Sequence, residues 1–239
     1  MVVMTSLVTW GILIFLSFLP PLLYTVWIRN TERCRREHWK PIFLCFLWGA
    51  TIAIIAAFIL EMIFELHLTY SSTNVEMTPF MAAIVIAPIV EEFTKPLALQ
   101  LKSVRRNLVE LEDGLIYGAV AGLGFSATEN LLYGYDFLSE GFFMFLVLMA
   151  IRSFGGCLLH ASATALTGYG YGKTVMKHTS LLRVIPYFIL AIFLHGFYNY
   201  LVSYELIGTV SGFFLAIFFV IISITMIRNK IKKLDKKNC

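Results

Sequence analysis

Long apolar runs alternate with short polar connections along the whole chain. The runs extend over 6–28, 41–66, 79–101, 114–134, 142–172, 184–204 and 208–227. A helix needs roughly 20 apolar residues to cross the hydrocarbon core of a bilayer, and none of the runs shows the alternation that a membrane β-strand requires. The pattern therefore predicts an all-α polytopic membrane bundle of about seven transmembrane helices, with 1–239 forming a single integral membrane domain.

Lysine and arginine residues gather in every second connection. The segments that carry them are 29–40, 102–113, 173–183 and the tail after 227. The connections between these segments carry none. Because basic residues are retained on the cytoplasmic side, this alternation predicts an outside N-terminus and a cytoplasmic C-terminus.

Composition agrees with a membrane protein. Hydrophobic residues make up 59% of the chain and charged residues only 14%, whereas soluble domains carry about 25% charged residues. The net charge of +4 comes from basic residues beside apolar runs, so the lipid bilayer explains it and a nucleic-acid partner does not. We expect a multi-pass membrane protein.

Several ionisable side chains lie inside the third to sixth apolar runs. They are Glu91, Glu92, Lys95, Glu129, Arg152, His160 and His195. Each such group costs at least about 2.5–3.5 kcal/mol in hydrocarbon, so a cluster of them on separate helices indicates a functional site. We interpret Arg152 as a residue that caps a polar network or reaches toward the membrane surface.

Depth along each helix predicts that these groups converge. At 1.5 Å per residue, Glu91, His160 and His195 lie roughly 16–18 Å from the cytoplasmic ends of their runs. Glu129 comes out nearer 24 Å, about one turn higher. Abundant glycine in its run would let that helix pack closely or tilt. The sequence thus predicts one polar site near the middle of the bilayer.

Spacing within the runs adds pairs of polar groups. Glu91 and Lys95 are four residues apart, which places an ion pair on one helix face. His195 and Asn199 have the same spacing and present an imidazole and an amide in one column. Pro88 interrupts the third run and should bend it or free carbonyl groups, as the lining of a cavity requires.

Carboxylates with imidazoles fit hydrolysis of a peptide bond, which needs an activated water, a proton shuttle and oxyanion stabilisation. Two neutral histidines and one carboxylate also form a usual catalytic zinc site. No H-E-x-x-H motif occurs, so such ligands would come from different helices. Two alternatives stay open: a proton- or ion-coupled transporter, although no inverted repeat is evident, and a non-catalytic membrane scaffold of the same fold.

Four segments resemble the ordered motifs of the PrsW family of intramembrane proteases. They are EEFTK (91–95), FSATEN (125–130), the span that contains His160, and HGFYN (195–199). The resemblance covers about 79–204, the expected catalytic core. The family is similar, more distantly, to the CAAX prenyl endopeptidase and Abi group. That group would have His where this chain has Glu129, which favours the PrsW branch and argues against prenylated substrates.

The resemblance implies a protease that cuts a single-span membrane substrate, such as a membrane-anchored anti-sigma factor, at the first of two sites. It also implies a prokaryotic plasma membrane and a bound metal, which we expect to be zinc. The expected catalytic residues are Glu91, Glu92, Lys95, His160 and Asn199, and the expected metal ligands are Glu129, His160 and His195. Within this set, we expect Glu91 to activate water as a base and Asn199 to stabilise the oxyanion.

Overall fold

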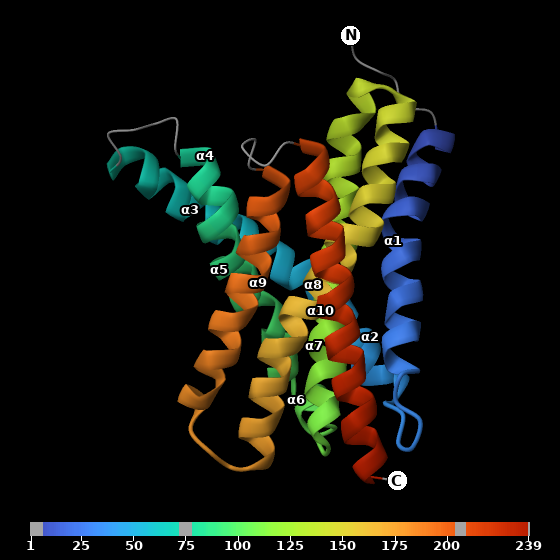
Figure 1. Ribbon diagram of the computed structural model, residues 1–239, viewed down its shortest axis with the longest axis vertical. Coiled ribbons are helices and arrows are strands. Elements are labelled where there is room, and N and C mark those ends of the chain that lie inside the picture. The colour runs from blue at the N-terminus through green and yellow to red at the C-terminus, as the bar shows by residue number, and fades with distance from the viewer. Residues whose placement is uncertain (1–6, 72–77, 204–208, 239) are drawn as a thin grey trace.

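The structure is a computed structural model that describes residues 7–71, 78–203 and 209–238. Every regular element in these ranges is a helix, as predicted (Figure 1). The first half of the chain forms α1 (Leu7–Arg29), α2 (Trp39–Trp48), α3 (Ile54–Ser71), α4 (Thr78–Met81), α5 (Ala87–Thr94) and α6 (Lys102–Arg105). The second half forms α7 (Leu111–Phe137), α8 (Phe142–Met176), α9 (Ile185–Ser203) and α10 (Thr209–Asn238).

Five helical stretches within the described ranges are long and apolar enough to cross a membrane. They are Leu7–Arg29, Trp39–His67, Phe142–Met176, Leu181–Ser203 and Val210–Lys237. The prediction of a helical membrane bundle is therefore confirmed in its coarse form. The two remaining predicted spans correspond to the broken segment 78–100 and to α7, so the count of seven and the orientation stay predictions.

The third apolar run is broken into short helices of different kinds. A π-helical turn (Ala82–Ile86) precedes α5, and a 3-10 helix (Lys95–Gln100) follows it. Pro88 and Pro96 lie near the starts of α5 and of the 3-10 helix. Because proline lacks an N–H group, it cannot complete a regular helix at these points. The type of helix therefore changes both before and after Glu91 and Glu92, which lie in α5.

Helix α7 lies inside the bundle and packs closely on α8. A Cβ atom added to Gly118 would lie 2.5 Å from the carbonyl oxygen of Thr164, and one added to Gly122 would lie 2.3 Å from that of His160. Small residues at this four-residue spacing allow helix backbones to approach each other in a membrane protein. The glycines of α7 thus bring its polar residues next to those of α8.

The basic connections lie at one end of the bundle. Figure 1 places the connection after α1, helix α6, the connection between α8 and α9 and the C-terminal end of α10 together, at the bottom of the view. The start of α1 lies at the opposite end. This is the arrangement that the predicted orientation requires.

Candidate active site

Three helices bring Glu91, His160 and His195 together inside the bundle. Their side chains are buried, and each offers one ligand atom within 4.8 Å of the others. His160 Nδ1 lies 3.6 Å and His195 Nε2 lies 4.0 Å from Glu91 Oε2. The two imidazole rings meet edge to face, with their centroids 5.0 Å apart. The three residues for which the sequence indicates equal depth thus form one group.

A second carboxylate fixes the orientation of each imidazole. His195 Nδ1 lies 2.9 Å from Glu92 Oε1, and His160 Nε2 lies 2.7 Å from Glu129 Oε2. Because an ionised carboxylate only accepts hydrogen bonds, these two ring nitrogens carry the protons. In neutral imidazoles, the lone pairs of His160 Nδ1 and His195 Nε2 are then directed toward Glu91.

Lys95 supplies a buried positive charge to the glutamate pair. Its Nζ lies 2.6 Å from Glu92 Oε1, 3.1 Å from Glu91 Oε2 and 3.0 Å from His160 Nδ1. The side chain is fully buried, and the ammonium group also lies 4.7 Å from the centre of the Phe125 ring. The ion pair that the sequence predicts between Glu91 and Lys95 is present, and Lys95 pairs with Glu92 as well.

Glu92 is held on several sides. Besides its contacts with Lys95 and His195, it accepts a hydrogen bond from Thr164 Oγ1 of α8 at 2.9 Å. The carboxylate is fully buried. Its contacts fix the side chains around it, and Glu91 is the member of the pair that lines the neighbouring cavity.

Glu129 lies on the outer side of His160 and pairs with Arg152. Arg152 Nη2 lies 2.8 Å from Glu129 Oε2, and Arg152 Nε donates to Asn130 Oδ1 at 2.9 Å. The guanidinium group also stacks 4.0 Å above the ring of Tyr133. Arg152 thus caps a polar network, as the sequence indicates. Glu129 is placed on the far nitrogen of His160, outside the three-atom group that contains Glu91.

Asn199 lies one helical turn after His195 on α9. Its Nδ2 donates to the backbone carbonyl of Ala83 at 2.8 Å. Ala83 belongs to the π-helical turn, in which the backbone N–H of Ala87 donates to the carbonyl of Ala82 five residues earlier. The amide of Asn199 therefore holds α9 to the broken segment.

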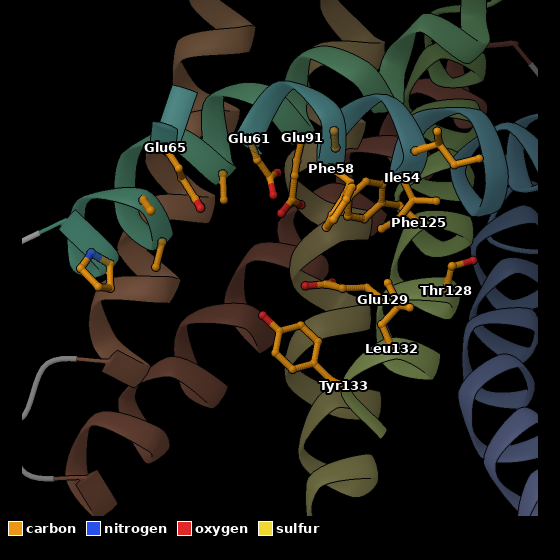
Figure 2. Close-up of a pocket in the computed structure, with 16 residues that line it drawn as sticks. Ile54, Phe58, Glu61, Glu65, Glu91, Phe125, Thr128, Glu129, Leu132 and Tyr133 are labelled. Atoms are coloured by element: carbon orange, nitrogen blue, oxygen red, sulfur yellow. The ribbon is translucent and has the colours of Figure 1, made fainter. Parts of the chain in front are cut away.

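A cavity of about 930 Å³ opens beside the group. It lies between α3, the segment that contains α4 and α5, and α7, and its walls are mainly apolar. Figure 2 shows Glu61 and Glu91 directed into it from one side, and Glu129 and Tyr133 from the other. Its size lies within the usual range for ligand pockets, about 300–1,000 Å³.

Glu61 and Tyr133 are cavity residues that the sequence reasoning missed. Glu61 and Glu65 occur four residues apart near the end of the second apolar run, and this spacing could have drawn attention to them. Tyr133 carries no comparable signal. Its position in the cavity depends on the rotation of α7 about its axis.

Comparison with known proteins identifies the family of this chain. The family model described as "PrsW family intramembrane metalloprotease" matches residues 37–226. The chain belongs to the PrsW family of intramembrane metalloproteases. It is also similar to "Protease PrsW" of Clostridioides difficile (strain 630), with 25% identity over 197 residues that cover 81% of this chain and 80% of that protein. No solved structure matches the chain significantly.

The donor set fits the metal that this PrsW-family membership implies. One carboxylate oxygen and two imidazole nitrogens, each from a different helix, match the three protein ligands of a catalytic zinc site, which leaves a fourth position for water. In such sites, the second imidazole nitrogen usually donates to a carboxylate, which fixes the tautomer. Glu92 and Glu129 occupy these two supporting positions.

Lys95 imposes one condition on this fit. Its ammonium group and a metal ion cannot share the lone pair of His160 Nδ1, which lies 3.0 Å from Nζ in this structure. Metal binding requires the loss of that contact. The shorter contact of 2.6 Å with Glu92 can remain, so Lys95 keeps an ionic partner.

Proposed function

We propose that the chain hydrolyses a peptide bond in single-span membrane proteins, at a zinc ion held by Glu91, His160 and His195. The observation that carries this proposal is the convergence of the three ligand atoms beside a large apolar cavity. Zinc is proposed because the donors are two imidazoles and a carboxylate. When bound, the ion would make its water more acidic and polarise the substrate carbonyl.

The residues around the ion have separate roles in this proposal. Glu129 lines the cavity and accepts the proton of the attacking water, which it then delivers to the leaving amine. Arg152 keeps Glu129 ionised in the apolar surroundings through their contact. Glu91 and Glu129 thereby exchange the roles of base and ligand that we expect from the sequence.

Three further residues act on the position of other groups rather than on the substrate. Glu92 holds the proton of His195 Nδ1, so that Nε2 is free to bind the ion. Lys95 balances the charge of the glutamate pair. Asn199 positions Ala83 through the hydrogen bond to its carbonyl, and Ala83 lines the cavity.

The cavity supports an unwound peptide segment as the substrate. Mainly apolar walls from α3 and α7 suit side chains that leave a membrane helix, and the carboxylates of Glu91 and Glu129 reach the cavity from opposite sides. The narrower proposal, first-site cleavage of a membrane-anchored anti-sigma factor near the outer face, rests on the resemblance of the motifs.

Cleavage by the purified protein in lipid tests the proposal. The substrate is a single-span reporter with an extracytoplasmic juxtamembrane segment. We expect Glu91→Gln and His160→Ala to abolish cleavage, and Glu129→Gln to slow it by about 100- to 10,000-fold because the base is lost. The control is Glu140→Gln, at an exposed glutamate outside the cavity, which should leave the rate unchanged.

Metal dependence is measured in the same assay. A chelator should stop cleavage by the wild type, and zinc should restore it. Wild-type activity that survives complete chelation would argue against the metal. Equal rates for all variants would contradict the protease site and would direct attention to proton flux.

A further inference from the structure

A second group of carboxylates lies at the end of the bundle that carries the basic connections. It is formed by the connection after α1, the start of α7 and the last turns of α10 (Figure 1). Its members, here called the end cluster, are Glu32, Glu37, Glu110, Glu112, Asp113 and Asp235. Five of the six are buried, and Glu110 is half-buried.

Glu32 is the centre of the end cluster. Its side chain is 0% exposed, and neither carboxylate oxygen has a hydrogen-bond partner among the described residues. Ligand atoms of Glu32, Glu112 and Asp235 lie within 4.8 Å of one another. Glu110 and Asp113 form a second such set with Glu32. A buried carboxylate without a partner is strongly unfavourable, so it either takes up a proton or binds a cation.

Nearby arginines direct the hydrogen bonds of their Nε atoms to uncharged oxygens. Arg36 Nε donates to the backbone carbonyl of Glu32 at 3.1 Å, and not to its carboxylate. Arg29 Nε donates to another backbone carbonyl at 2.7 Å, and Arg228 Nε donates to Thr31 Oγ1 at 3.0 Å. These contacts order the connection after α1 but leave the charge of Glu32 unpaired.

The surrounding acids make a bound cation favourable. Burial, followed by the charges of Asp113, Glu112 and Asp235, raises the pKa of Glu32 to about 8. Asp235 is itself fixed in place, because its two oxygens accept the backbone N–H groups of Arg33 and Cys34 at 3.0 Å each. The end cluster is therefore a preorganised set of oxygen atoms.

We propose that the end cluster binds a divalent hard cation, of the Ca²⁺ or Mg²⁺ type, through Glu32, Glu112 and Asp235. Carboxylate oxygens are the preferred ligands of such ions, and the set contains no imidazole or thiolate. The ion joins the connection after α1 to α7 and to α10. It thereby fixes the C-terminal helix to the helix that also carries Glu129.

Thermal unfolding of the full-length protein in lipid nanodiscs tests this site. The protein is first treated with a chelator and then titrated with CaCl2 or MgCl2. We expect the Tm of the wild type to rise by roughly 5 °C or more at a cation concentration about 100 times Kd. The variant Glu32→Gln should lose this rise, because the central ligand loses its charge.

Glu91→Gln is the matched control, since it makes the same change at a buried glutamate of the active site. It should keep the full rise in Tm, which separates the two sites and makes the result independent of the proposed protease function. Isothermal titration calorimetry should give the same Kd for the wild type and for Glu91→Gln. Equal Kd values would place the binding outside the group of Glu91, and this comparison needs no variant of the end cluster. An unchanged wild-type Tm, or an equal rise in Glu32→Gln, would overturn the proposal. A wild-type Tm that responds to pH but to neither cation would assign the counter-charge to protons and would overturn it too.

Discussion

The active site and the end cluster contain the same kind of group, buried carboxylates, but neutralise it differently. In the active site, Glu92 contacts Lys95 at 2.6 Å and Glu129 contacts Arg152 at 2.8 Å. In the end cluster, the carboxylate of Glu32 has no partner among the described residues. Charged groups inside the bilayer have to be paired within the protein. A cluster at the end of the bundle lies close to water and can take its counter-charge from dissolved ions.

The largest expected effect comes from removal of the ammonium group of Lys95, which contacts both Glu91 and Glu92. Lys95→Met should leave the buried glutamate pair without its ammonium group, and loss of one partner of a buried ion pair costs about 3–5 kcal/mol. We expect a Tm lowered by roughly 10 °C or more, or little folded protein. The control Lys102→Met removes an exposed lysine and should have little effect.

A double variant separates charge from packing at the same position. Lys95→Met combined with Glu92→Gln removes both partners of the shortest contact and should recover part of the lost stability. If Lys95→Met alone unfolds at the wild-type Tm, the pairing described for the active site is wrong.

A smaller effect on activity is expected from a substitution of Arg152, whose partner Glu129 contacts His160. Arg152→Met removes the guanidinium group that contacts Glu129. Groups that orient metal ligands typically change affinity or activity by about 10- to 100-fold, so kcat/KM for the reporter should fall within this range. Arg183→Met, at an exposed arginine, is the control. An unchanged kcat/KM in Arg152→Met would show that Glu129 does not need this partner.

The smallest effect is expected from Glu32→Gln, which is compared with the same substitution at Glu92. In chelated buffer, Glu92→Gln should lower the Tm, because Lys95, His195 and Thr164 all contact that carboxylate. Glu32→Gln should leave the Tm unchanged or raise it by a few degrees, because it removes repulsion and no hydrogen bond. Equal losses of Tm in the two variants would remove the contrast between the regions.

Much of this arrangement can be predicted from the sequence. Long apolar runs predict the helices, because burial in lipid requires length and apolarity. Counting residues along the helices predicts that Glu91, His160 and His195 meet, since helical rise is constant. The same count places Glu129 about one turn higher, and in the structure it lies on the outer nitrogen of His160.

Other features depend on contacts that spacing does not reveal. The pairing of Arg152 with Glu129 joins two helices and depends on their rotation. The proton position on each imidazole follows from its carboxylate partner. The end cluster joins residues more than 200 positions apart in the chain, such as Glu32 and Asp235, and residue spacing within a single helix cannot predict such a contact.

The close packing of Gly122 against the backbone of His160 makes the geometry of the site depend on a residue without a side chain. A Cβ atom at Gly122 would lie 2.3 Å from the carbonyl oxygen of His160, so even an alanine there would force α7 and α8 apart. Because Glu129 lies on α7 and His160 on α8, such a separation would disturb the 2.7 Å contact between their side chains. A position that has no functional group of its own thus sets the spacing of two groups that do.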